Sequence, residues 1–160
     1  MYLRWWRMGH SIVNENQINA VGIWFYALDT RRNLFLMRND KKYHGCWGLP
    51  GGKIETGESL YDALERECRE ELGAMPEYVK LTPVEKFTSD NNRFSYHTFF
   101  CVIEEEFIPE LNHEHVGYAW IDSGLIPKPL HPGFWSTLKV DDVASKIEQV
   151  RDLYTSQCEI

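Results

Sequence analysis

The sequence contains no apolar run that approaches the roughly 20 residues of a membrane-spanning helix. Its longest apolar stretch, residues 21–28, has the length of a β-strand. The first residues carry basic side chains but no apolar segment after them, so we expect no secretory signal. These two absences predict a cytoplasmic protein with no membrane partner.

Cysteine is also scarce, and no two of the four cysteines form the C-x-x-C pair that is typical of zinc ribbons. Cys46, Cys68 and Cys101 have apolar or aromatic neighbours, and Cys158 lies near the C-terminus. We therefore expect reduced, structural thiols, in agreement with a cytosolic location.

Positive charge is in deficit, because 24 acidic residues outnumber 17 basic ones and the formal net charge is -7. Such a chain is a poor general binder of duplex nucleic acid, whose affinity depends on phosphate neutralisation. A small phosphorylated ligand remains compatible with this charge, since a metal ion can bridge carboxylates to a phosphate. With 160 residues, 43% hydrophobic and 26% charged, the chain is expected to form one folded domain over residues 1–160.

The pattern of apolar residues predicts strands and helices in alternation. A hairpin is expected from residues 19–28 and 34–38, followed by two long strands at 79–88 and 93–103 and a short one at 118–121. Helices are expected at 59–72 and 141–154, the second capped by Asp141 or Asp142. Residues 125–132, with three prolines, are expected to form a surface loop, and residues 131–134 to lie at the rim of a pocket. The sum is an α/β fold, with a mixed sheet between helices.

The helix at 59–72 has clear start and stop signals. Ser59 is a suitable N-cap, with Asp62 three residues later as the acid of a capping box, and Gly73 ends the helix. An apolar stripe recurs every fourth residue from Leu60 to Leu72 and is expected to face the sheet.

Three carboxylates lie at the edge of that stripe. Glu67, Glu70 and Glu71 stand at i, i+3 and i+4, so their side chains converge on one patch. A charge beside the core is costly unless it is paired or bound to a metal, and oxygen ligands favour Mg²⁺ or Mn²⁺ over zinc. The alternative is a solvated acidic face with Arg66 and Arg69 as partners. Gly51, Gly52 and Gly57 precede the helix directly and allow close approach of the backbone to a ligand, which favours the metal site.

The spacing of these residues resembles the signature of the Nudix family. That signature is Gly, five residues, Glu, seven residues, Arg-Glu, an aliphatic residue, any residue, Glu-Glu, any residue, Gly and an aliphatic residue. Its charged and glycine positions are matched by Gly52, Glu58, Arg66, Glu67, Glu70, Glu71 and Gly73. The departures are Cys68 and Ala74, which are small where a larger aliphatic residue is usual.

This resemblance implies a Nudix-type α/β/α sandwich and an enzyme that uses Mg²⁺, with Mn²⁺ as the alternative. The implied reaction cleaves the pyrophosphate bond of a nucleoside triphosphate or a related nucleoside diphosphate derivative by attack of a metal-activated water on phosphorus. Two alternatives stay open: a nucleotide-sugar glycosyl hydrolase on the same fold with His115 as base, and a non-catalytic nucleotide-sensing module. A homodimer is also left open, since dimers are common in the family.

The resemblance also implies roles for individual residues. The metal ligands would be Glu67, Glu70, Glu71 and the backbone carbonyl of Gly51. Arg66 would hold Glu58 or Glu70 in place from behind these ligands.

Three further residues are candidates outside the signature or at its start. The resemblance suggests Glu114, in a loop, as a further ligand or as the catalytic base, a role for which Glu70 and Glu71 are the other candidates. Arg38, at the end of a strand, and Lys53, in the glycine loop, are candidates for binding substrate phosphates; each is equally consistent with an ordinary surface charge.

Overall fold

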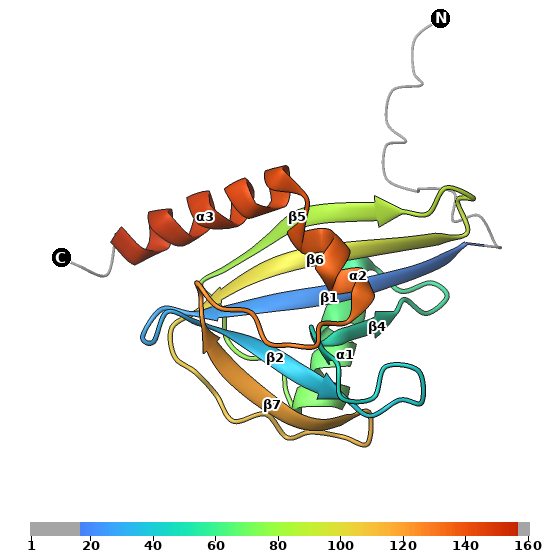
Figure 1. The fold of residues 1–160 in the computed structure, drawn as a ribbon, viewed down its shortest axis with the longest axis horizontal. Helices are drawn as coiled ribbons and strands as arrows, with labels where there is room; N and C mark the ends of the chain where they lie inside the picture. Colours follow the sequence, from blue (N-terminus) through green and yellow to red (C-terminus); the bar gives the residue numbers. More distant parts are fainter. Residues whose placement is uncertain (1–16, 157–160) are drawn as a thin grey trace, which may run out of the picture.

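One mixed sheet of seven strands organises residues 17–156, the part of the chain that the computed structural model describes (Figure 1). The strands are β1 (Ile18–Ala27), β2 (Arg32–Arg38), β3 (Trp47–Gly48), β4 (Gly51–Lys53), β5 (Lys80–Thr88), β6 (Phe94–Ile103) and β7 (His115–Asp122). The helices are α1 (Leu60–Leu72), α2 (Pro132–Leu138) and α3 (Asp141–Thr155). One domain over residues 1–160 stays a prediction, since the structure describes only residues 17–156.

Strand β1 is the centre of the sheet. It runs parallel to β6 along its whole length, from the pair Ile18 and Phe94 to the pair Ala27 and Ile103. Its other neighbours, β2 and β4, are antiparallel to it. β5 pairs with the far side of β6, and β3 and β7 pair with β2. The short β4 is thereby held directly against the middle of β1.

Each face of the sheet buries its own apolar core. On β1, Val21, Ile23 and Phe25 pack toward α1, whereas Trp24 and Tyr26 pack toward α2 and α3. β6 alternates in the same way, as expected for a central strand that is covered on both sides. Figure 1 shows α1 behind the sheet and α2 in front of it. The predicted α/β/α sandwich is confirmed.

The ends of α1 follow the predicted signals. The Ser59 hydroxyl accepts a hydrogen bond from the Asp62 amide at 3.1 Å, and the Asp62 carboxylate accepts one from the Ser59 amide at 3.3 Å. At the other end, Gly73 has φ 90°, the left-handed conformation that ends many helices. Together the two caps fix where α1 begins and ends, and therefore where its carboxylates lie.

The structure corrects the sequence prediction at four places. Gly51–Lys53, expected in a loop before the helix, form strand β4, because they pair with the middle of β1. Pro132, assigned to the end of a loop, is the first residue of α2, a position where its missing N–H costs nothing. β7 begins at His115 rather than at residue 118, because its pairing with β2 extends the strand. The N-cap of α3 is Val140, without a side-chain cap, and Asp141 and Asp142 lie in the first turn instead.

Membrane-spanning helices and cysteine pairing were both predicted to be absent. Within residues 17–156, no helix combines the length and the apolar character needed to cross a membrane. Cys46, Cys68 and Cys101 are free thiols, the last two buried. Cys158 lies outside the described residues.

Candidate active site

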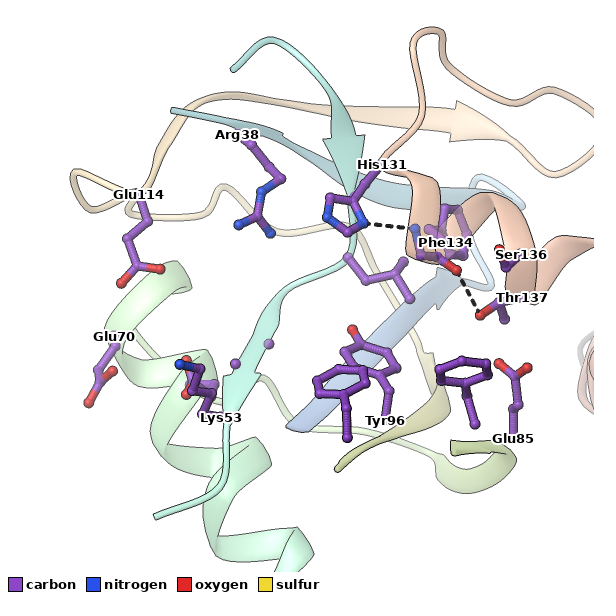
Figure 2. A pocket seen from close by; sticks show the side chains of 18 of the residues that line it. Arg38, Lys53, Glu70, Glu85, Tyr96, Glu114, His131, Phe134, Ser136 and Thr137 are labelled. Carbon is purple, nitrogen blue, oxygen red and sulfur yellow. Dashed lines mark hydrogen bonds between the residues drawn. The ribbon is translucent and has the colours of Figure 1, made fainter. Parts of the chain in front are cut away.

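A cavity of about 900 Å³ opens between the β4–α1 unit, the ends of β5 and β6, and helix α2 (Figure 2). It is also lined by the end of β2 and by the loop before β7. Most of the predicted site residues line this one cavity, although they come from separate parts of the chain. Glu58 and Glu71 do not line it, but each is hydrogen-bonded to a residue that does.

Glu71 is buried beneath β4. Only 1% of its surface is exposed, and its Oε2 accepts a hydrogen bond from the Gly51 amide at 2.8 Å. Gly51 has φ 146°, and a Cβ at this position would collide with the Val21 carbonyl oxygen on β1. Glycine is therefore required to bring this amide onto Glu71. Burial raises the pKa of Glu71 to about 9, and repulsion from Glu67 and Glu114 adds to this shift.

Glu67 lies beneath the next residue of β4. A Cβ on Gly52 would collide with the Glu67 carboxylate, so the backbone and the carboxylate are in close contact. Burial raises the pKa of Glu67, and repulsion from Glu70 and Glu114 acts in the same direction. The carboxylates around this end of the cavity are therefore close enough to disfavour one another's charge.

Arg66 connects the glycine loop to the helix. Its guanidinium donates to Glu58 at 2.8 and 3.0 Å, to Glu67 at 2.7 Å and to the Lys53 carbonyl at 2.9 Å. A longer contact of 3.4 Å reaches Glu70. Hydrogen bonding from Arg66 holds the pKa of Glu58 below its usual value. The structure thus joins Arg66 to Glu58, as predicted for residues that hold the metal ligands in place.

Glu70 differs from the other two helix carboxylates. Its side chain is 51% exposed, whereas Glu67 and Glu71 are buried. Within residues 17–156, no three His, Cys, Asp or Glu side chains already stand around one point as a formed metal site. The predicted convergence is present for Glu67 and Glu71, and Glu70 would have to turn inward to join them.

The donor atoms at this end of the cavity suit a hard cation. All the candidates are carboxylate or carbonyl oxygens, which Mg²⁺ and Mn²⁺ prefer and which are poor zinc ligands without sulfur or imidazole. The buried Glu71 accepts only the Gly51 amide among its described contacts, so its second oxygen is free to bind. The residues present therefore fit the predicted ion.

The three remaining candidates lie beside these carboxylates. Arg38, Lys53 and Glu114 all line the cavity, and Figure 2 shows them on the same side as Glu70. Arg38 is held at the end of β2 by Asp40, with 2.6 Å between Nε and Oδ2. The backbone carbonyl of Glu114 accepts a hydrogen bond from the backbone amide of Asn39, which fixes the loop of Glu114 next to the end of β2. Together with Arg66, three basic side chains thus line the same cavity as the carboxylates.

His115, the base in one alternative, has a different position. It is 8% exposed, pairs with Arg38 across β7 and β2, and does not belong to the cavity lining. Burial lowers its pKa to about 4, and repulsion from Arg38 contributes. His115 is thus a neutral residue of the sheet near neutral pH.

The opposite end of the cavity is aromatic. Phe87, Phe94 and Tyr96 form one wall, and Phe134 of α2 belongs to the other. His131 also lines the cavity, and its Nδ1 accepts from the Gly133 amide and caps α2 (Figure 2). The expectation that residues 131–134 rim a pocket is confirmed. The aromatic wall and Glu85 beside it were not predicted, although alternation along residues 85–87 and 94–96 is a usable signal.

Comparisons with known proteins agree with this geometry. The sequence model of the NUDIX domain matches residues 17–139, so the chain belongs to the NUDIX hydrolase family. A similar protein is the nucleoside triphosphatase NudI of Escherichia coli O17:K52:H18 (strain UMN026 / ExPEC), 37% identical over 93 residues. That match covers 49% of this chain and 63% of NudI, so less than two thirds of the relative's length is spanned.

Two solved structures illustrate the shared fold. A MutT NUDIX hydrolase from Burkholderia pseudomallei superimposes with a TM-score of 0.55 and 25% identity, over 76% of this chain and 96% of that one. The NUDIX domain of Shewanella oneidensis NrtR, complexed with ADP ribose, gives a TM-score of 0.58 at 18% identity, over 87% and 89%. The second likeness concerns the fold alone. The predicted family is confirmed.

Proposed function

We propose that this chain hydrolyses a phosphoanhydride bond of a nucleoside triphosphate or a related nucleoside diphosphate derivative, with Mg²⁺ or Mn²⁺ as cofactor. The observation that carries this proposal is the placement of two buried carboxylates, Glu71 under Gly51 and Glu67 under Gly52. Both glycines and Glu67 line one end of a cavity of about 900 Å³, and Glu71 lies directly behind this lining. A volume of this order lies within the range of small-molecule sites. The similarity to a nucleoside triphosphatase supports the substrate class.

The metal would be held by Glu67, Glu70, Glu71 and the backbone carbonyl of Gly51. When bound there, the ion would neutralise part of the pyrophosphate charge and lower the pKa of a bound water. Glu70 lines the cavity but is exposed, so its rotation toward Glu67 and Glu71 would be coupled to metal binding.

The remaining roles fall to side chains that surround these ligands. Glu70, Glu71 and Glu114 are the candidates for accepting the proton of the attacking water. Arg38 and Lys53 bind and orient the phosphates through charge-assisted hydrogen bonds. Arg66 is a positioning residue, because it joins Glu58, Glu67 and the Lys53 carbonyl in one network.

The alternatives receive less support. Glycosidic cleavage with His115 as base has little support, because His115 lies outside the cavity lining and its imidazole, unlike the Glu71 carboxylate, has no described hydrogen bond to a residue of that lining. A purely sensing role would be consistent with lost carboxylates, but all those of the signature are retained. The cytoplasmic location and the homodimer stay predictions.

The direct test is a substrate panel. We would incubate the protein with nucleoside triphosphates, ADP-ribose, dinucleoside polyphosphates and nucleotide sugars, in Mg²⁺, in Mn²⁺ and in excess chelator, and measure released phosphate and pyrophosphate. We expect hydrolysis that the chelator abolishes. In ¹⁸O-water the label should enter a phosphate product; label in the sugar would support glycosidic cleavage instead. Nucleotide binding without any hydrolysis would contradict the proposal and favour the sensing module.

A further inference from the structure

A β-bulge in β5 changes which of its side chains face the aromatic end of the cavity. Pro83 pairs with Phe99 on β6, but the next pair along is Glu85 with Thr98, so Val84 is an extra residue. In a regular ladder Val84 would stand opposite Thr98, and Glu85 would fall on the other face of the sheet. The bulge instead places Glu85 on the face that carries the cavity, an effect for which bulges near functional sites are known.

Glu85 has few partners of its own. It lines the cavity, and its one described hydrogen bond comes from the Thr98 hydroxyl at 3.5 Å, the upper limit for such a bond. Within residues 17–156 no ion pair involves it. The basic side chains of the cavity lining belong to β2, β4 and α1, and Figure 2 shows Glu85 on the far side from Lys53. Its carboxylate therefore retains free acceptor capacity toward the cavity.

The surroundings of Glu85 suit a flat ring. Phe94 and Tyr96 lie with their rings 27° apart and centroids at 6.4 Å, which gives the cavity a continuous aromatic wall. Tyr96 reaches across to β1, where a Cβ on Gly22 would collide with its hydroxyl. Across the cavity, α2 contributes Phe134 to the opposite wall. Every nucleobase can stack in such a slot, so stacking alone would not discriminate between bases.

We propose that Glu85 is the residue that selects the base and that the base it selects is guanine. This inference rests on the proposed function, because it assumes that the phosphates of a nucleotide lie at the carboxylate end of the same cavity. An ionised carboxylate is acceptor-only, with two oxygens side by side. Guanine presents two adjacent donors, N1–H and the N2 amino group, and so can satisfy both oxygens at once.

The other bases match this carboxylate less well. Adenine and cytosine each present one amino donor beside a ring nitrogen that is itself an acceptor. Uracil and thymine present a single N–H between two carbonyl oxygens, which repel a carboxylate. The expected order of affinity is therefore guanine first, adenine and cytosine next, and uracil last.

Calorimetric titration with the four nucleoside monophosphates tests this order independently of hydrolysis, since they contain no anhydride bond. We expect the wild-type protein to bind GMP roughly tenfold or more tightly than UMP, as one bidentate pair can provide. Glu85→Gln should bring that ratio near one, while Glu85→Asp, which keeps the charge, should retain part of it. Glu77→Gln removes the same charge at an exposed position and should leave the ratio unchanged.

Several outcomes would overturn the inference. These are equal binding of GMP and UMP by the wild-type protein, an unchanged ratio in Glu85→Gln, or the same loss in Glu77→Gln. If no monophosphate binds measurably, the ratio of kcat/KM for GTP and UTP replaces the affinity ratio, and a ratio near one in the wild-type protein is also contradictory. Failure of hydrolysis together with a Glu85-dependent preference for GMP would disprove the proposed function but retain this inference.

Discussion

The two ends of the cavity are built in different ways. The carboxylate end comes mainly from one continuous segment, from Gly51 to Glu71, in which a glycine strand folds back over its own helix. The aromatic end is assembled from β5, β6 and α2, and Glu85 reaches it only because of the bulge at Val84. One end is local in sequence and the other depends on tertiary pairing.

This difference suggests that the two ends have different functions. The local unit is constrained by backbone contacts that only glycine tolerates, whereas the aromatic wall is built from side chains of three separate elements. We therefore expect substitutions at the carboxylate end to affect turnover and those at the aromatic end to affect substrate affinity and choice. The following predictions test that contrast.

Glu71→Gln should have the largest effect. The amide keeps the size of the side chain and can still accept from Gly51, but it removes a proposed ligand and base. We expect turnover to fall by about 10²- to 10⁴-fold, the range of a lost catalytic group. Steady-state kinetics with Mg²⁺ measure this loss, and circular dichroism checks the fold. Glu65→Gln, an exposed position on the same helix, is the matched control; unchanged turnover in Glu71→Gln would remove its assignment.

Phe87→Ala should separate binding from chemistry. Loss of one stacking surface is expected to raise KM about tenfold, because base stacking on an aromatic side chain is worth about 1–3 kcal/mol. The turnover number should change much less, since the carboxylate end is untouched. Tyr78→Ala provides a control, because Tyr78 is exposed to a similar degree but lies outside the cavity. An equal fall in turnover would show that the two ends are not separable.

The metal-free protein should lose stability as the pH rises from 7 to 9. The pKa of Glu71 is about 9 in the folded state, because of burial, against 4.5 as the ordinary value. Between these values the folded state holds a proton that the unfolded state has released, so the free energy of unfolding falls with rising pH. The slope is at most about 1.4 kcal/mol per pH unit.

Thermal melts in chelator measure this slope. Glu71→Gln should flatten it, whereas Glu65→Gln should not. A melting temperature that stays constant from pH 7 to 9 in the wild-type protein would contradict the account of Glu71.

Ser59→Ala should give the smallest effect. It removes the side-chain cap of α1, the helix that carries the carboxylates, and such caps are worth about 1 kcal/mol. We expect a melting temperature lower by about 2–4 °C, as is usual for a chain of this size. Ser145→Ala, exposed on α3, serves as control. A loss as small as that of the control would mean that the helix start is fixed by the Arg66–Glu58 ion pair rather than by its cap.

The carboxylate end could be predicted from the sequence because its information is local. Ser59, Gly73 and the spacing of Glu67 and Glu71 define a helix, its ends and its buried edge without reference to the rest of the chain. Glu70 shows the limit of this local prediction. It was expected to converge with Glu67 and Glu71, but its position at the border of the apolar stripe leaves it exposed.

The other end could not be predicted because it depends on register. An alternating strand does not reveal whether a bulge shifts one side chain to the opposite face, and so Glu85 was missed. Helix α2 was missed because Pro132 was interpreted as part of a proline-rich loop rather than as a helix start. Both features are decided by neighbours that are distant in sequence.

The parallel pairing of β1 with β6 has a consequence for how the molecule folds. All of β2, β3, β4, α1 and β5 are synthesised between these two strands, so joining them closes a long loop. Closing such loops slows folding, because entropy is lost before the distant contacts form. The pairing of β1 with β6 should therefore form late along the folding pathway. The aromatic wall should form with it, because the Tyr96 hydroxyl contacts Gly22 on β1.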